Sequence, residues 1–150
     1  MPGDTALMRT LCGASSLEAF ANEVVDQAYR LGYVYPDPNP RTGQPFTIEE
    51  IERTMPIETK LCGALPTITK TRSPKGTALW QRFGHLRKIR HIIVHPKPAQ
   101  LVQTSPDVNR AWKLLTDASF RNFAIDAKAL MMHYCAEGAH AARWLHKCPF

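Results

Sequence analysis

The sequence of 150 residues lacks the features that mark several common classes of protein. No apolar run approaches the roughly 20 residues that span a bilayer, so we expect no membrane segment. Residues 1–9 contain Asp4 and no apolar core of signal-peptide length, which predicts no secretory signal. The cysteines lack the close spacing of a zinc knuckle and lie far apart, at Cys12, Cys62, Cys135 and Cys148. We therefore expect a soluble, cytoplasmic protein with free thiols.

Several catalytic and structural patterns are also missing from the sequence. It contains no phosphate-binding glycine loop, dinucleotide fingerprint or nucleophilic serine motif, and we expect no cofactor. It also lacks a convincing period-two pattern of the kind that strands produce. With 44% hydrophobic and 21% charged residues, the composition is that of a globular protein. The sequence predicts a single all-α domain over residues 1–150, built as a bundle of four to five helices.

Acidic residues are absent from the middle of the chain. Residues 59–106 contain none, although the same segment holds nine lysines and arginines, whereas residues 1–58 hold nine acids and four lysines or arginines. The net charge is +6. Such a basic block attracts anions, of which phosphate is the commonest. Charge alone leaves open a solvated face that the acidic N-terminal third balances.

Helix signals account for most of the first half of the chain. Ser15 or Ser16 can cap a helix that ends at Gly32, with Leu17, Phe20, Ala21, Val24, Ala28 and Leu31 on one face. Residues 33–46 hold four prolines and predict a long loop, which is either functional or mobile. Thr47 and Glu50 form a capping box for a second helix that Pro56 should end. A looser stretch should follow to Ser73.

Three more helices are expected in the second half. Ser73 and Pro74 form a start signal for a helix that runs to Val94 or His95, because Pro96 disfavours helical angles at the residue before it. Ser105 and Pro106 repeat that signal for a helix to about Thr116. The last helix should cover roughly residues 119–146.

One arginine interrupts an apolar stripe on the helix before Pro96. Positions 79, 83, 86, 90 and 93 share a face and hold Leu79, Phe83, Leu86, Arg90 and Ile93. Burying an unpaired arginine costs several kcal/mol. The stripe therefore predicts a carboxylate, phosphate or wet subunit boundary at Arg90. The plainer interpretation is an internal ion pair with Glu23, Asp26 or Asp126.

Two histidines flank the end of the same helix. His91 and His95 lie with Arg90 around an apolar turn, an arrangement that is common in active sites. A helix C-terminus favours a protonated ring, so His95 can exchange protons near neutral pH. The two histidines also have the spacing of a metal chelate. However, no third ligand is evident and Ile92 replaces the glutamate of zinc proteases, so we expect no metal.

The segment 83–96, FGHLRKIRHIIVHP, resembles the HEPN superfamily of helical-bundle proteins. The similarity consists of Arg90, a polar residue at His91, three apolar residues, His95 and a proline at the end of a helix. Many HEPN proteins are metal-independent endoribonucleases that act as homodimers, in which the RNA 2′-hydroxyl attacks the adjacent phosphate. The resemblance implies that His95 is the general acid or base, that Arg90 stabilises charge on the phosphate, and that His91 supports them.

The resemblance also implies partners. Such enzymes are often toxins or antiviral defence effectors that an antitoxin protein restrains. In one toxin branch the antitoxin modifies a tyrosine two residues after the motif histidine; Lys97 stands there, which argues against that control. The family more often has Asn where His91 stands. Other HEPN domains are not catalytic and serve for dimerisation and nucleotide or partner binding, which is the alternative function.

Further cations and one aromatic residue complete the expected RNA-binding set, which comprises Trp80, Arg87, Lys88, Lys97, Lys70, Arg72 and Lys75. Trp80 can stack on a base, although ordinary core packing is the plainer interpretation. A third hypothesis is a helical protein that binds DNA or RNA through the basic block alone, with affinity that collapses as salt increases.

Overall fold

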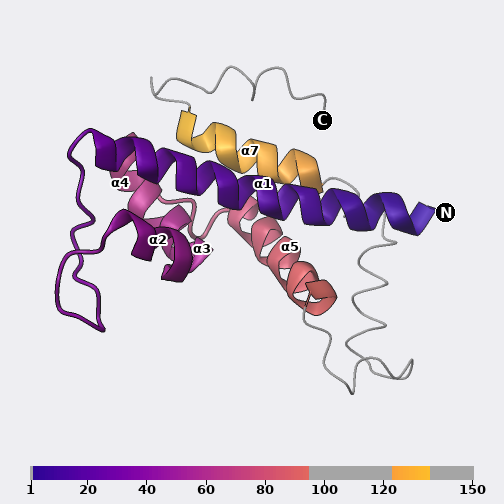
Figure 1. Ribbon diagram of the computed structural model, residues 1–150. Coiled ribbons are helices and arrows are strands. Elements are labelled where there is room, and N and C mark those ends of the chain that lie inside the picture. Colours follow the sequence, from indigo (N-terminus) through magenta and orange to yellow (C-terminus); the bar gives the residue numbers. More distant parts are fainter. Residues whose placement is uncertain (1, 95–122, 136–150) are drawn as a thin grey trace. The chain divides into compact units, whose positions relative to one another are not determined.

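The computed structural model describes residues 2–94 and 123–135, and its helices are shown in Figure 1. They are α1 (Pro2–Arg30), α2 (Ile48–Thr54), α3 (Ile57–Thr59), the π-helical turn η1 (Lys60–Ala64), α4 (Leu65–Thr69), α5 (Ala78–Val94) and α7 (Phe123–Cys135). Within these ranges the only β-type pairing is an isolated bridge between Pro38 and Pro45. The predicted all-α class is therefore confirmed. The helix expected over 105–116 and the end of the last one lie outside the described residues.

The contacts of the chain define two compact units. Among the described residues, the first comprises 2–16, 76–94 and 123–130, and the second comprises 17–75 and 131–135. Helices α1 and α7 each contribute residues to both units. None of the helices in the described ranges is long and apolar enough to cross a membrane. Cys12, Cys62 and Cys135 form no disulfide within these ranges, and Cys148 lies outside them.

The first unit packs α5 against the start of α7. Burial of apolar side chains drives this packing, and its core consists of Phe83, Leu86, Ile89, Phe123, Ala127 and Leu130. Gly13 of α1 lets the α1 and α7 backbones come close: a Cβ there would lie 3.3 Å from the Phe123 carbonyl oxygen. Across the same unit, Arg82 Nε donates to Asp126 Oδ1 at 2.7 Å.

The second unit packs the C-terminal part of α1 against α2, the helical segment 57–69 and the last residues of α7. Its core includes Leu17, Phe20, Val25, Ile51, Leu61, Leu65 and Tyr134, all buried. The end of α1 closes as predicted at Gly32, where Tyr33 N–H donates to Ala28 and Gly32 N–H donates to Tyr29. This Schellman pattern requires the positive φ of 91° that glycine adopts without strain.

The predicted start of α1 is wrong. The helix runs through Ser15 and Ser16 from Pro2, because residues 5–14 include good helix formers such as alanine, leucine and methionine. The buried face also differs by one position, since Val25 is fully buried whereas Val24 is half-buried. Leu31, expected on that face, is 90% exposed.

The loop and the second helix follow the prediction. No helix occupies residues 33–46, and α2 begins at the predicted capping box: Glu50 N–H donates to Thr47 Oγ1, and Thr47 N–H donates to Glu50. The same bond lowers the pKa of the Glu50 carboxyl, because the backbone N–H of Thr47 stabilises its charged form. Helix α2 ends at Thr54, just before Pro56.

The prediction of a looser stretch after Pro56 is wrong, because residues 57–69 are helical. Pro56 is the N-cap of α3 rather than only the end of α2. The π-turn η1 then places Pro66 in the first turn of α4, where a missing N–H is tolerated. Helix α5 also starts later than Ser73 and Pro74 predicted.

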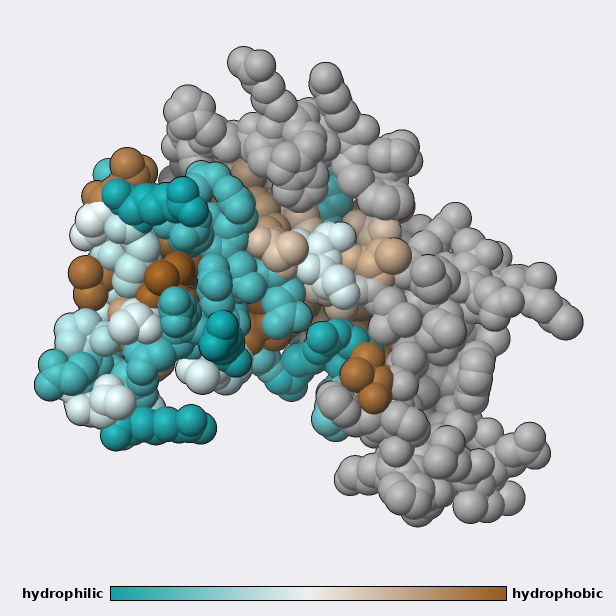
Figure 2. Space-filling view, in the orientation of Figure 1, coloured by the Kyte–Doolittle hydropathy of each residue, from teal (hydrophilic) through white to brown (hydrophobic). Residues whose placement is uncertain are grey.

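Hydrophilic residues predominate among the described residues on the face that Figure 2 shows, with scattered hydrophobic ones between them. The large hydrophobic side chains that are exposed in the described ranges are Leu31, Val34, Val94 and Ile125. Isolated apolar residues of this kind are normal on a folded surface.

Candidate nucleic-acid interface

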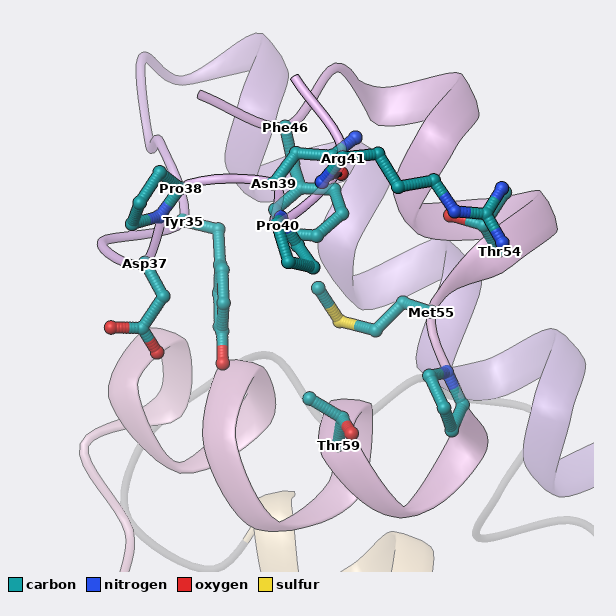
Figure 3. A pocket seen from close by; sticks show the side chains of 11 residues that line it. Tyr35, Asp37, Pro38, Asn39, Pro40, Arg41, Phe46, Thr54, Met55 and Thr59 are labelled. Atoms are coloured by element: carbon teal, nitrogen blue, oxygen red, sulfur yellow. Dashed lines mark hydrogen bonds between the residues drawn. The ribbon is translucent and has the colours of Figure 1, made fainter. Parts of the chain in front are cut away.

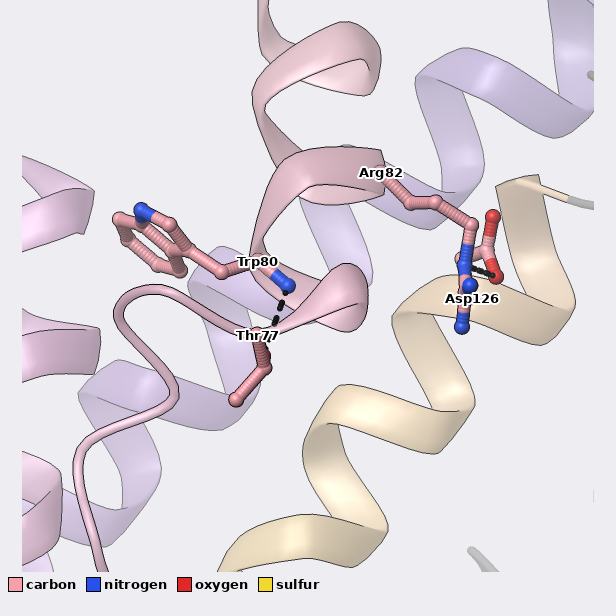
Figure 4. A network of polar contacts seen from close by, with 4 residues as sticks. All are labelled: Thr77, Trp80, Arg82 and Asp126. Atoms are coloured by element: carbon pink, nitrogen blue, oxygen red, sulfur yellow. Dashed lines mark hydrogen bonds and ion pairs between the residues drawn. The ribbon is translucent and has the colours of Figure 1, made fainter.

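Helix α5 carries most of the predicted site, and a side-chain cap fixes where it begins. Trp80 N–H donates to Thr77 Oγ1 at 3.2 Å, as Figure 4 shows. Gly76 precedes the cap with a φ of 87°, a conformation that glycine adopts readily. Side-chain capping by Thr77 therefore replaces the cap predicted at Ser73.

The buried stripe of α5 passes through Phe83, Leu86 and Ile89. Ile89 is fully buried, whereas Arg90 is half-buried. Arg90 shares the helix face of Phe83 and Leu86, and its side chain is half-buried there rather than enclosed. At this position the guanidinium can reach solvent while its aliphatic stem stays on apolar surface.

Two of the carboxylates proposed as partners of Arg90 pair with other arginines. Asp126 accepts from Arg82, and Asp26 accepts from Arg30 Nε at 2.8 Å. The pair between Arg82 and Asp126 joins α5 to α7 (Figure 4). Asp126 therefore offsets the charge of Arg82, whose side chain is 50% exposed.

The opposite side of α5 is exposed and cationic. Arg87, Lys88 and His91 are all exposed there, and the helix contains no acidic residue. We call these three residues the α5 cationic face. On an ideal helix Arg87 and His91 are neighbours four positions apart. Both side chains are exposed to solvent.

Trp80 lies on the N-terminal part of the same helix. It is half-buried, and its ring packs against Phe83 with centroids 4.9 Å apart and planes inclined by 35°. Trp80 projects away from the side that carries Arg82 (Figure 4). The half-buried ring therefore contacts an aromatic neighbour and keeps some accessible surface.

The remaining predicted cations do not all fall on α5. Lys70, Arg72 and Lys75 are exposed, and they belong to the second unit rather than the first. Lys70 ends α4 with a φ of 57°, and the Arg72 carbonyl oxygen lies 2.7 Å from His133 Nε2. His95 and Lys97 lie outside the described residues.

One cation of the basic block is buried rather than exposed. Lys60 is 1% exposed, and its Nζ donates to Asn22 Oδ1 at 2.7 Å and to the Glu52 carbonyl oxygen at 3.0 Å. Burial lowers the pKa of Lys60, because the charged ammonium loses its hydration there. Lys60 is one of the nine cations of the basic block, and its apolar neighbours Leu61 and Ala64 are the sequence signal of its burial.

A hydrogen bond from α7 completes the π-turn that contains Lys60. Leu65 N–H donates to the Lys60 carbonyl oxygen, five residues back. Pro66 has no N–H for the next carbonyl, that of Leu61, and the Tyr134 hydroxyl donates to it instead. Burial raises the pKa of Tyr134, so the phenol remains a donor. Sequence reasoning missed this interaction.

No group of three or more His, Cys, Asp or Glu side chains within residues 2–94 and 123–135 could hold a metal ion. The comparisons with protein-family models, with curated proteins and with solved structures find no match for this chain.

Proposed function

We propose that this chain is a metal-independent endoribonuclease of the HEPN type, which binds RNA on the α5 cationic face and cleaves it at the end of that helix. The observation that carries the proposal is the exposure of Arg87, Lys88 and His91 on a helix that has no acidic residue. Half-buried Arg90 lies between this face and the core. Phosphates attract such a surface without regard to base sequence.

The chemistry requires a base, an acid and a cation near one phosphate. A histidine takes the proton of the RNA 2′-hydroxyl, whose oxygen attacks the adjacent phosphorus and displaces the 5′-oxygen of the next nucleotide. A protonated group returns a proton to that leaving oxygen, and a cyclic phosphate remains. We assign the proton transfers to His95, stabilisation of the pentavalent phosphate to Arg90, and support of both to His91.

Helix geometry favours a dimeric site. Arg90 and His95 are five residues apart, which separates them by about 140° around an ideal helix. One helix cannot easily aim both groups at one phosphate. A two-fold axis beside α5 would let one copy supply the arginine and the other supply the histidine.

RNA cleavage in the presence of EDTA tests the proposal. Purified protein is incubated with mixed RNA, and the products are run on a denaturing gel beside an Arg90→Ala, His95→Ala double variant. His85→Ala is the matched control, because His85 is an exposed histidine on the same helix. We expect cleavage by the wild type and the control only. Equal cleavage by the double variant would contradict the assignment of this site.

The second candidate is a non-catalytic HEPN module that dimerises and binds a nucleotide or a partner protein. The half-buried position of Arg90 favours it as much as catalysis, since an arginine at the edge of a core suits a subunit boundary. Sedimentation of the purified protein, together with the RNA cleavage assay described above, separates the two candidates. A stable dimer that cleaves none of the RNAs is expected only for the non-catalytic module.

A further inference from the structure

The proline-rich loop between α1 and α2 forms one wall of a pocket in the second unit. The pocket has a volume of about 360 Å³. Loop residues face Met55, Pro56 and Thr59 across it. In Figure 3 the side chains of Tyr35, Pro40, Met55 and Thr59 surround one hollow. This volume is within the range of sites that bind small molecules or a few side chains of a peptide.

A buried asparagine organises the loop around the pocket. Asn39 is 5% exposed, and its backbone N–H donates to the Gln44 carbonyl oxygen at 2.8 Å. Its own carbonyl oxygen accepts from Thr42 and Gly43, while its Oδ1 accepts from Arg41 N–H at 3.0 Å. Because these bonds fix the turn, a ligand would not have to order this part of the chain on binding.

The walls of the hollow are apolar and partly aromatic. The Tyr35 ring packs edge-on against Phe46, with centroids 6.0 Å apart and planes inclined by 74°. Met55, which is 7% exposed, presents its thioether opposite the Tyr35 ring (Figure 3). An aromatic ring makes favourable contacts with a thioether, and it also packs well against the edge or the face of another ring. The walls therefore suit a flat aromatic group.

Two opposite charges lie on different sides of the hollow. Arg41 lies along one rim and Asp37 lies beyond Tyr35 on the other, as Figure 3 shows. Arg41 is exposed, and no side chain in the described residues accepts a hydrogen bond from its guanidinium. An exposed arginine on the rim of an apolar hollow is a natural partner for a carboxylate.

We propose that this pocket binds a peptide segment that places an aromatic side chain between Tyr35, Pro40 and Met55 and a carboxylate on Arg41. Asp37 repels a second acid and sets the direction of the segment, with its acidic end toward Arg41. This binding site lies in the second unit, whereas α5 belongs to the first.

The proposal is tested with short peptide probes and the Met55 methyl signal. Full-length protein labelled at the methionine methyls is titrated with acetyl-Trp-Asp-amide, and Met55→Leu identifies the signal. Acetyl-Trp-Asn-amide is the matched uncharged probe, and acetyl-Ala-Asp-amide lacks the ring. N-acetyltryptophan offers a chain-terminal carboxylate instead of a side-chain one.

We expect a saturable shift of the Met55 methyl with the Trp-Asp probe and none with the Ala-Asp probe. The Trp-Asn probe should bind about three- to fivefold more weakly, the effect of one partly exposed ion pair. Arg41→Gln should abolish that difference. If N-acetyltryptophan binds more tightly than the Trp-Asp probe, the carboxylate that Arg41 binds is that of a chain terminus rather than that of a side chain.

Thr59→Phe provides a second variant, since Thr59 is exposed and borders the hollow. Its phenyl ring should fill the space and weaken the Trp-Asp probe at least tenfold, with an unchanged circular dichroism spectrum. The proposal is overturned if neither the Trp-Asp probe nor N-acetyltryptophan saturates, if neither of them binds the wild type more tightly than the Trp-Asn probe, or if Thr59→Phe binds as the wild type does.

Discussion

The hydrogen bond from Tyr134 to Leu61 offers a direct test of how the second unit holds its π-turn. Leu61 is fully buried and Tyr134 is 1% exposed. Tyr134→Phe keeps the ring, which packs near Phe20 with centroids 6.4 Å apart, and removes only the hydroxyl. A buried carbonyl left without a donor costs about 1–3 kcal/mol. We expect Tyr134→Phe to lower the free energy of unfolding by about 2 kcal/mol.

A second substitution isolates the cause. Pro66→Ala supplies a backbone N–H at the position from which a π-turn would reach the Leu61 carbonyl oxygen. Alone, this change should cost about 0.4–1 kcal/mol, because the unfolded chain regains freedom at residue 66. In the Pro66→Ala background, however, Tyr134→Phe should cost about 1 kcal/mol less than in the wild type, since the carbonyl has another donor.

Urea unfolding followed by circular dichroism measures all four proteins of this cycle. Because Tyr134 replaces the N–H that Pro66 lacks, the two substitutions should be coupled: their effects on the free energy of unfolding should not add. If Tyr134→Phe unfolds within about 0.5 kcal/mol of the wild type, or if the two changes simply add, the hydroxyl is not the substitute donor for Leu61.

Three further predictions concern the helices and their charges. Gly13→Ala should lower the unfolding midpoint, because its Cβ meets the α7 backbone at 3.3 Å, whereas Gly84→Ala, which meets nothing within 4 Å, should raise it. Because burial lowers the pKa of Lys60 from its ordinary 10.5, the folded protein binds fewer protons, so its free energy of unfolding should rise with pH between the lowered value and 10.5. Lys60→Met should remove that rise in pH-dependent urea unfolding. Replacing Arg87 and Lys88 by alanine should weaken binding of single-stranded RNA and reduce its logarithmic salt slope by about 1.4 in a fluorescence titration; an unchanged slope would exclude phosphate contacts there.

Signals confined to a few neighbouring residues predicted the fold most accurately. The capping box of Thr47 and Glu50 and the closure of α1 at Gly32 depend on bonds within one turn, and both are present. The end of α2 before Pro56 is a similar case, because a proline has no N–H and its ring clashes with the preceding turn, so α2 cannot continue through it. Such features need no knowledge of the rest of the chain.

Competing signals explain the errors. Ser15 and Ser16 can cap a helix, yet the residues before them also favour helix, and the continuous helix α1 results. The stretch after Pro56 looked irregular because Gly63 and Pro66 disfavour an α-helix. Its π-turn is completed by a hydroxyl from Tyr134, more than sixty residues away, which no local pattern could reveal.

The basic block shows what charge alone can and cannot predict about the site. Its cations are not equivalent, since Lys60 is buried and Arg82 binds Asp126. Lys70, Arg72 and Lys75 belong to a different unit from α5. What the described structure leaves for an anion on α5 is the face of Arg87, Lys88 and His91, beside half-buried Arg90. The proposal of RNA cleavage therefore depends on the end of one helix rather than on the +6 net charge, and a variant at that end is a sharper test than any change in the other cations.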